Sequence, residues 1–194
     1  SLIKADLRLD KIYFRQLDSI VTVSQSSAAA LKRFFPEAVS KIVIIRNIIP
    51  AKLIRRMALS GNQLPPKQPG EVFITTVARL VGLKGIDLIV EVCKKLCDAG
   101  YKLKWFVVGD GIERPKLVKL VNSYKLNDSF YLLGTKHNPY PYIREADIYV
   151  QPSRGEGFGM TVAEAKILYK PIVASDLPEF REQLVDGLTG LLAP

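Results

Sequence analysis

From Glu71 onward, short apolar runs alternate with segments whose apolar residues recur at helical spacing. The runs are nearly all apolar rather than alternately polar, so we expect strands built from them to be buried on both faces. This is typical of a parallel sheet covered by helices on both sides, and we expect an α/β fold. The predicted strands are Val72 to Ala78, Trp105 to Val108, Phe130 to Leu133, Ile148 to Val150, Pro171 to Ala174 and Thr189 to Leu192.

The loop from Ser153 to Gly159 is rich in glycine and lies between a predicted strand and a predicted helix that begins at Met160. Glycine lets a ligand approach the backbone, and the first N–H groups of the helix, near Gly159 to Val162, form an anion site. Glu156 and Glu164 frame this site and suit sugar hydroxyls, because carboxylates only accept hydrogen bonds. The pattern favours a sugar nucleotide as ligand; the alternative is a glycine-rich connector that binds nothing.

Ligands of a parallel sheet bind outside the carboxyl ends of its strands. The loop from Arg79 to Gly85 follows such an end and carries two cations, Arg79 and Lys84. Because Arg and Lys bind phosphate oxygens, we expect this loop to hold a diphosphate together with the Met160 helix. The other loops expected at this edge are Gly109 to Gly111, Gly134 to His137 and Ser175 to Glu179.

Composition excludes several other classes of protein. The 194 residues are 48% hydrophobic, but no apolar run approaches the ~20 residues of a membrane helix, and a signal-peptide pattern is absent. Cys93 and Cys97 share one face of a predicted helix, and with His137 as the single histidine no zinc-ligand set is present. We expect a cytoplasmic protein with reduced core thiols, no metal, and a solvated His137. The sequence lacks an initiator Met and a closing helix, and we expect a fragment of a longer protein.

The net charge of +9 is concentrated in the first third of the chain. Residues 1–70 hold 12 Lys and Arg against 4 Asp and Glu, whereas residues 71–194 hold 16 against 15. A basic segment attracts nucleic acid, an anionic membrane or an acidic substrate. The sequence has neither aromatics interleaved with the cations nor a nucleic-acid-binding motif, so nucleic acid is not an expected partner. We expect peripheral contact with an anionic membrane or an anionic acceptor; a merely solvated face is the alternative.

The N-terminal segment predicts a small set of elements. An amphipathic helix is expected over residues 5–17, followed by strands over Ile20 to Val23 and Ile42 to Ile45. Between these strands, Ser24 is the expected N-cap of a helix that ends before Pro36.

Five sequence elements follow one another in order along the chain. They are Arg79-Leu80 with Lys84-Gly85, Val108-Gly109-Asp110-Gly111, Pro152-Ser153 with Glu156-Gly157-Phe158-Gly159, Glu164, and Pro178-Glu179 with Asp186-Gly187-Leu188-Thr189-Gly190-Leu191-Leu192. This ordered set, with its Glu-x7-Glu spacing, resembles the retaining GT-B glycosyltransferases of family 4, the glycosyl transferases group 1.

The resemblance implies two Rossmann-like domains that face a cleft, one for the acceptor and one for the nucleotide-sugar donor. Residues 71–194 match the donor domain with its doubly wound parallel sheet. Residues 1–49 match a remnant of the acceptor domain and the interdomain junction. Residues 50–70 are the expected linker, which includes the Pro- and Gly-rich stretch from Ser60 to Gly70. Such a chain is expected to bind donor but not to transfer sugar by itself.

The resemblance also implies a role for each matching residue. Arg79 and Lys84 would hold the donor diphosphate and stabilise its charge as it leaves. Glu156 would lie under the transferred sugar, and Glu164 would hold the ribose hydroxyls. The other expected contacts are the backbone N–H groups of Gly157, Phe158, Gly159 and Met160 for the sugar, those of Thr161 and Val162 for the phosphates, and Gly109, Gly134 and Lys136 for the nucleotide.

The expected reaction is transfer of a sugar from a nucleoside-diphosphate sugar, a UDP-sugar, to a carbohydrate or lipid-linked acceptor, with retention at the anomeric carbon. An Asp-x-Asp motif is absent from the sequence, so Arg79 and Lys84 would take the place of a metal ion, and no cofactor is expected. The product would belong to polysaccharide or glycoconjugate biosynthesis. Two alternatives stay open, a non-catalytic nucleotide-binding module and a GT-B-fold sugar-nucleotide epimerase.

Overall fold

The structure is a computed structural model that describes residues 13–61 and 64–194. The chain divides into two compact units, Ser1–Ile48 and Ile49–Pro194. In the first unit, β1 and β2 form a parallel pair in which Ile20 lies opposite Ile42. Its elements are β1 (Ile20–Thr22), α2 (Gln25–Phe34), a 3-10 helix η1 (Pro36–Lys41) and β2 (Ile42–Ile44).

The first unit confirms the predicted strands and the helix between them. Ser24 is the N-cap of α2, and its hydroxyl accepts a hydrogen bond from the Ser27 N–H at 3.1 Å. Ile20, Phe35 and Ala38 form its small buried core. The helix expected over residues 5–17 lies outside the described residues except for its end, and residues 13–16 are helical.

The second unit is built on a six-stranded sheet in the order β5-β4-β3-β6-β7-β8, in which every pairing is parallel. The observed α/β fold with a parallel sheet confirms the prediction from the apolar runs. The strands are β3 (Val72–Val77), β4 (Leu103–Val108), β5 (Phe130–Leu132), β6 (Ile148–Gln151), β7 (Ile172–Ser175) and β8 (Leu191–Ala193).

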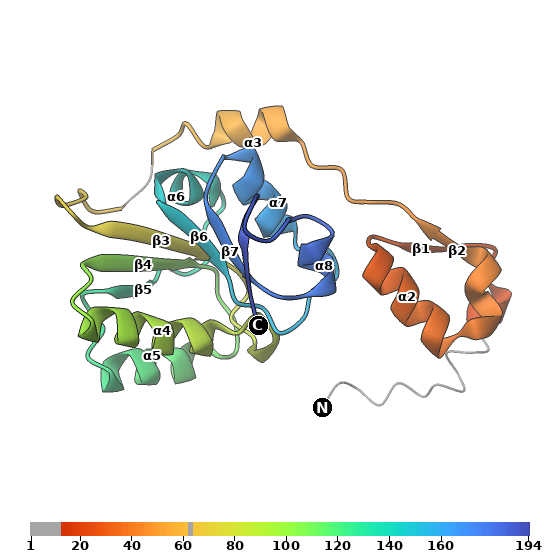
Figure 1. Ribbon diagram of the computed structural model, residues 1–194, viewed down its shortest axis with the longest axis horizontal. Coiled ribbons are helices and arrows are strands. Elements are labelled where there is room, and N and C mark those ends of the chain that lie inside the picture. Colours follow the sequence, from red (N-terminus) through yellow and green to blue (C-terminus); the bar gives the residue numbers. More distant parts are fainter. Residues whose placement is uncertain (1–12, 62–63) are drawn as a thin grey trace. The chain divides into compact units, whose positions relative to one another are not determined.

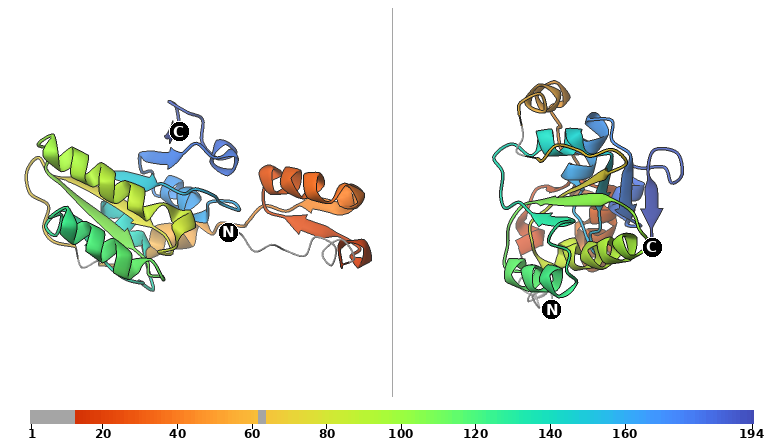
Figure 2. Two further views of the ribbon diagram at one scale, coloured as in Figure 1. Left: turned by 90° about the horizontal axis from the view of Figure 1, so that it is seen from below. Right: turned by 90° about the vertical axis from the view of Figure 1, so that its left-hand side faces the viewer.

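Helices cover both faces of this sheet. Figure 1 shows α4 and α5 on one face and α6 and α7 on the other, with α3 beyond them, and the views in Figure 2 show the same layers. The longest described helix has 13 residues, and none is long and apolar enough to cross a membrane. The helices are α3 (Ala51–Met57), η2 (Gly82–Lys84), α4 (Ile86–Asp98), α5 (Arg114–Ser123), α6 (Tyr140–Glu145), α7 (Met160–Ile167) and α8 (Pro178–Arg181).

Each face of the sheet has its own buried core. Trp105 and Val107 of β4 pack with the α4 and α5 side chains, and Cys93 is buried among them as a free thiol. Burial raises the pKa of Cys93 to about 12, so this thiol stays protonated. On the opposite face, Tyr149 and Val162 belong to a second core with residues from α3 and α8.

The sequence-based division placed residues 50–70 in a linker, but residues 51–57 form α3, which is part of the second unit. Ile54 is fully buried in the core beneath α7, and Arg55 donates to the Ile167 carbonyl oxygen at 3.3 Å and stacks on Tyr169. Only one side chain of α3 is buried, and three of its seven residues are Lys or Arg. An apolar face this short gives no clear helical periodicity in the sequence. Without regular secondary structure is a shorter segment than the predicted linker, the proline-containing residues 64–68 before β3.

Gly85, the residue before α4, offers a test of the close contact between two loops. Its φ is +64°, and a Cβ there would lie 2.0 Å from the Pro152 carbonyl oxygen. Gly85→Ala therefore combines left-handed backbone strain with a steric clash, and we expect it to lower the free energy of unfolding by about 2 kcal/mol or more. Urea unfolding followed by the fluorescence of Trp105, the single tryptophan, measures this loss.

The matched control is Gly82→Ala in the same loop. A Cβ at Gly82 has no atom within 4 Å, and the residue belongs to the 3-10 helix η2. We expect Gly82→Ala to be neutral or slightly stabilising. Equal unfolding midpoints for the two variants would contradict the close approach.

Candidate functional site

The strand order brings two of the predicted loops together. Because β6 pairs with β3, the loop after β3 and the loop after β6 leave neighbouring strands at the same edge of the sheet. The Arg154 N–H donates to the Leu83 carbonyl oxygen at 2.8 Å, and the Arg154 guanidinium donates to the Gly82 carbonyl oxygen and to both carboxylate oxygens of Asp87. The two loops are thus joined by backbone and side-chain contacts.

Lys84 and Glu156 form an ion pair across these joined loops. The Lys84 ammonium lies 2.6 Å from Oε1 of Glu156, and their side chains are only 16% and 9% exposed. The Ser153 hydroxyl donates to the same oxygen at 2.7 Å. A pair this shielded from water interacts more strongly than a surface pair. The sequence assigned these residues separately, one to the diphosphate and one to the sugar; the structure places them in direct contact.

Arg79 lies at the start of the same loop and is exposed. Within residues 13–61 and 64–194, its side chain takes part in no hydrogen bond or ion pair. The structure therefore brings Lys84 to Glu156 but leaves Arg79 without a contact to either. An exposed guanidinium on this loop can bind an anionic ligand with its five N–H donors.

The N-terminus of α7 lies in the predicted anion-binding loop. Gly159 caps the helix with φ +82°, and a Cβ there would lie 2.5 Å from the Phe180 ring. Gln183 donates through its amide nitrogen to the Phe158 carbonyl oxygen and, at 3.4 Å, to that of Gly159. The glycine is thus required by packing against Phe180 as well as by the turn. No acidic residue occupies the first turn of α7, so nothing there opposes an anion.

Glu164 receives a hydrogen bond that the sequence analysis missed. The Tyr140 hydroxyl, on α6, donates to Oε1 of Glu164 at 3.2 Å. Burial raises the pKa of Glu164, and the hydrogen bond from Tyr140 opposes that rise. Burial and the nearby Glu164 charge raise the pKa of Tyr140 to about 12, which keeps the phenol protonated as a donor. No sequence motif marks Tyr140; only the packing of α6 against α7 brings it to Glu164.

Gly109 and Gly134 are joined by a backbone hydrogen bond. The Gly109 N–H donates to the Gly134 carbonyl oxygen at 2.9 Å, and a Cβ at Gly109 would lie 1.9 Å from the Ala78 carbonyl oxygen. Backbone packing is therefore one reason for glycine at position 109. Lys136 extends over the Tyr142 ring at 6.0 Å, and the neighbouring His137 is exposed. Among the described residues, no group of three or more His, Cys, Asp and Glu side chains could hold a metal ion.

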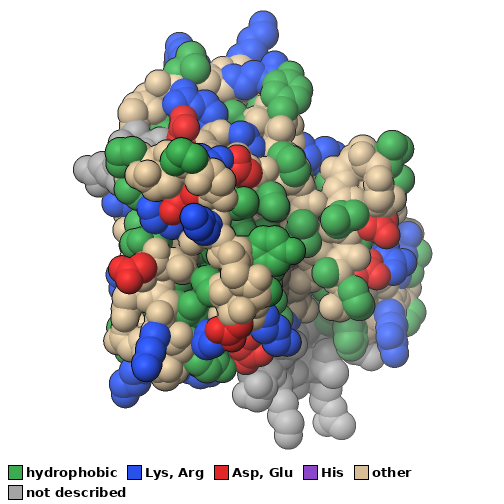
Figure 3. Space-filling model, turned by 60° about the vertical axis from the view of Figure 1, so that its left-hand side comes forward, with side chains coloured by type: hydrophobic (Ala, Val, Ile, Leu, Met, Phe, Trp, Pro, Cys, Tyr) green, Lys and Arg blue, Asp and Glu red, His purple; other side chains and the backbone are tan. Residues whose placement is uncertain are grey.

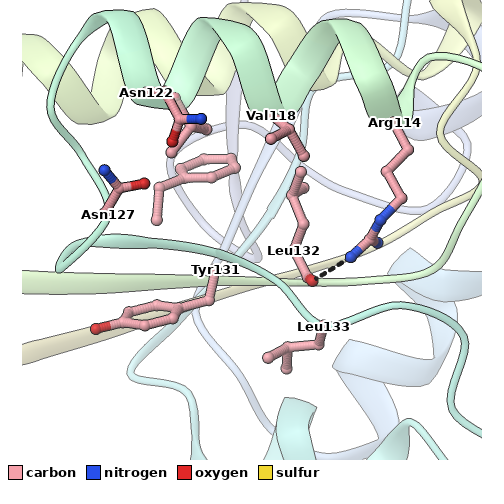
Figure 4. A pocket seen from close by; sticks show the side chains of 9 residues that line it. Arg114, Val118, Asn122, Asn127, Tyr131, Leu132 and Leu133 are labelled. Atoms are coloured by element: carbon pink, nitrogen blue, oxygen red, sulfur yellow. Dashed lines mark hydrogen bonds between the residues drawn. The ribbon is translucent and has the colours of Figure 1, made fainter.

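One cavity lies away from this loop cluster, and a second borders it through Gln151 and Pro152. One of about 260 Å³ lies between α5 and β5; Figure 4 shows Arg114 at one end, donating to the Leu132 carbonyl oxygen, with Asn122 and Asn127 farther along the wall. The other, about 510 Å³ and mostly apolar, lies between α4 and the strands β6 and β7. Lys84, Glu156 and Glu164 line neither of these two cavities.

Comparison with known proteins identifies the family. Residues 63–194 match the family model described as Glycosyl transferases group 1. The O-antigen biosynthesis glycosyltransferase WclY of Escherichia coli is 37% identical over 105 residues, which cover 54% of this chain and 29% of that protein. An N-acetylgalactosamine-N,N'-diacetylbacillosaminyl-diphospho-undecaprenol 4-alpha-N-acetylgalactosaminyltransferase of Campylobacter jejuni is 27% identical over 185 residues, covering 95% of this chain and 48% of that protein.

Solved structures share the fold. Anabaena Alr3699/HepE in complex with UDP-glucose superposes with a TM-score of 0.77 at 18% identity, covering 100% of this chain and 55% of that one. The sucrose-phosphate synthase of Thermosynechococcus elongatus superposes with a TM-score of 0.80 at 24% identity, covering 97% and 48%. The chain thus spans about half the length, or less, of the relatives that it matches here. It has the α/β fold of GT-B glycosyltransferases and belongs to the glycosyl transferases group 1 family.

Proposed function

We propose that the protein is a retaining glycosyltransferase of family 4 that transfers a sugar from a UDP-sugar to a carbohydrate or lipid-linked acceptor, and that this chain supplies the donor-binding half of the site. The observation that carries the proposal is the contact of Lys84 with Glu156 across the two joined loops, beside the α7 N-terminus. Cations and the N-terminus of a helix, which suit a diphosphate, thus lie next to a carboxylate, which suits hydroxyls.

The donor diphosphate is held by Arg79, Lys84 and the α7 N-terminus. One N–H of the Lys84 ammonium points to Glu156, which leaves two for phosphate oxygens. At the helix end the Thr161 N–H binds the phosphates, whereas the Val162 N–H, also expected there from the sequence, donates to the Gly159 carbonyl oxygen at 3.1 Å. The positive charge at the leaving group comes from these residues, without a metal ion or other cofactor. Electrostatic stabilisation of this kind is usually the largest contribution to catalysis.

Glu156 accepts hydrogen bonds from the transferred sugar, and Glu164 accepts them from the ribose. The backbone N–H groups of Gly157 to Met160 add contacts to the sugar, while Lys136 lies at the nucleotide end. The leaving phosphate takes the proton of the acceptor hydroxyl on the same face of the sugar, which gives retention. Support for the UDP-sugar comes from the solved relatives, because HepE is described in complex with UDP-glucose.

Arg79→Ala tests the diphosphate assignment by itself. Hydrogen bonds to a charged group contribute about 1.5–3 kcal/mol, so we expect the affinity for UDP to fall about 10- to 100-fold. Isothermal titration calorimetry with UDP and with uridine measures the change, and uridine affinity should stay constant because it lacks phosphates. Lys119→Ala, which removes an exposed cation from α5, is the matched control. Equal losses of UDP affinity in the two variants would show that Arg79 acts only through its long-range charge and not through contact with the diphosphate.

Glu156→Gln tests the chemistry in the full-length enzyme that carries this chain. We expect sugar transfer to fall at least about 100-fold while UDP affinity changes little, because the carboxylate charge that faces the sugar is removed whereas the Gln amide oxygen can still accept from Lys84. Turnover with a UDP-sugar and acceptor, and UDP binding by calorimetry, are measured side by side. Wild-type turnover in the variant would remove Glu156 from the mechanism. A donor sugar converted in the absence of acceptor would identify an epimerase instead.

Glu164→Gln should make the stability less dependent on pH. A raised pKa in the folded state means that Glu164 contributes most stability when protonated, and that this contribution is lost as the pH rises through the raised value. We therefore expect the wild type to lose stability relative to Glu164→Gln as the pH rises above the ordinary glutamate range near about pH 4, since Gln can still accept from Tyr140. Urea midpoints across this range measure the difference. Glu91→Gln, an exposed carboxylate, is the control, and parallel pH profiles for all three proteins would contradict the burial effect.

The acceptor is proposed to be lipid-linked or anionic and to lie at the inner face of a membrane. The basic residues are concentrated in residues 1–70, whereas on the face that Figure 3 shows, Lys and Arg are interspersed with Asp and Glu. We expect flotation with anionic liposomes to exceed that with neutral ones, and the excess to fall in Lys32→Gln/Arg33→Gln on α2. The matched control is Lys116→Gln/Lys119→Gln on α5. Equal flotation with both liposomes would refute membrane contact.

A further inference from the structure

A chain of hydrogen bonds runs from the core of the sheet to Glu156. The Tyr149 hydroxyl donates to Oε1 of Gln151 at 2.8 Å, and the Thr161 hydroxyl donates to the same oxygen at 3.1 Å. The Gln151 amide nitrogen donates to Oγ of Ser153 at 2.9 Å. The Ser153 hydroxyl in turn donates to Oε1 of Glu156 at 2.7 Å. Residues 149, 151 and 153 alternate along β6 and its extension, so their side chains follow one face of the strand.

This chain is shielded from solvent over most of its length. Tyr149 is 0% exposed, and Gln151 and Ser153 are each 1% exposed. Burial raises the pKa of Tyr149 above its usual range, so its hydroxyl remains a donor. If the buried Gln151 amide lost its hydrogen-bond partners, the folded state would lose free energy of stabilisation. This cost keeps the hydrogen-bonded groups in the observed arrangement.

The chain has a single direction of donation. Two hydroxyls donate to the Gln151 amide oxygen, so the Gln151 amide nitrogen faces Ser153. Oγ of Ser153 therefore accepts a hydrogen bond from this nitrogen. A serine hydroxyl has only one proton to donate, and that proton goes to Glu156, whose ionised carboxylate only accepts. In the opposite orientation of the amide, its oxygen would compete with Glu156 for the Ser153 proton. The buried amide therefore decides where the hydroxyl points.

Both contacts to Glu156 end on the same oxygen. Lys84 and Ser153 bind Oε1, whereas Oε2 accepts no hydrogen bond within the described part of the chain. The Glu156 side chain keeps 9% of its surface exposed, and Oε2 is the oxygen left to accept a hydrogen bond from a ligand. The carboxylate is thus anchored by one oxygen and presents the other.

We propose that Ser153, oriented by Gln151, is a positioning residue that anchors Glu156 through Oε1 and so directs Oε2 toward the donor sugar. The inference rests on the proposed function in one respect, that Glu156 faces the transferred sugar. The inference adds that the orientation of the Glu156 carboxylate toward the sugar is set by buried side chains of the sheet core, which do not touch the donor. Preorganisation of this kind lowers the cost of ordering a binding group.

The test compares the affinities of the 194-residue chain for UDP, UDP-glucose and UDP-N-acetylglucosamine by titration calorimetry. The quantity of interest is the ratio of UDP-sugar affinity to UDP affinity, because it isolates the contribution of the sugar. We expect Ser153→Ala to lower this ratio about tenfold, roughly the contribution of one hydrogen bond to a charge, with UDP affinity unchanged. Ser153→Thr, which keeps a hydroxyl, should restore the ratio.

Two further variants separate positioning from general damage. In a Glu156→Gln background, Ser153→Ala should lower the ratio no further, because it acts only through Glu156. Thr76→Val also removes a fully buried hydroxyl, one that contacts Trp105 and the Val150 carbonyl oxygen rather than Glu156, and it should leave the ratio unchanged.

The outcomes distinguish the inference from the function on which it rests. If the wild type binds neither UDP nor a UDP-sugar, the proposed function fails and the inference falls with it. If the wild type binds donor and Glu156→Gln lowers the ratio but Ser153→Ala does not, the inference alone is overturned. If Glu156→Gln leaves the ratio unchanged, the proposed contact of Glu156 with the sugar fails, and the inference falls with it. A parallel loss of UDP and UDP-sugar affinity in Ser153→Ala would also overturn it, since that result indicates general structural damage.

Discussion

The close approach of two loops is the constraint on which the candidate site depends. Gly85, in the loop after β3, lies against the Pro152 carbonyl oxygen with no room for a side chain. Arg154, in the loop after β6, donates hydrogen bonds to the carbonyl oxygens of Leu83 and Gly82 and to the Asp87 carboxylate. Only with the loops this close can the Lys84 ammonium reach the Glu156 carboxylate. The loops are close because β3 and β6 are paired neighbours in a parallel sheet, which places their carboxyl ends side by side.

The Lys84–Glu156 pair has a cost that the surrounding structure offsets. Two largely shielded charges lose most of their hydration, and their mutual attraction compensates for this only when further hydrogen bonds complete the site. Ser153 supplies one such bond, and the proposed diphosphate and sugar would supply the others. The arrangement is thus compatible with a site that is completed by its donor.

Several glycines of the recognisable motifs are explained by packing. Gly109 and Gly111 would each place a Cβ within 2.5 Å of a backbone oxygen of the loop after β3, and Gly159 would place one against the Phe180 ring. Gly157 differs, because a Cβ there has no atom within 4 Å. A glycine-rich motif therefore combines residues that let the loops pack with a position where an added Cβ would contact nothing.

The sequence by itself determined the alternation of strands and helices, the loops at the carboxyl ends of the strands and the family, because apolar periodicity and motif spacing are local properties of the chain. It also located Glu156 and Glu164 on a loop and on the helix that follows it. Only the tertiary structure decided which side chains meet. Lys84 and Glu156 are 72 residues apart, and Tyr140 and Glu164 are 24 apart. Their contacts depend on strand order and helix packing, which no local pattern specifies. The charged α3 likewise joined the second unit because its single buried isoleucine, Ile54, fits the core beneath α7.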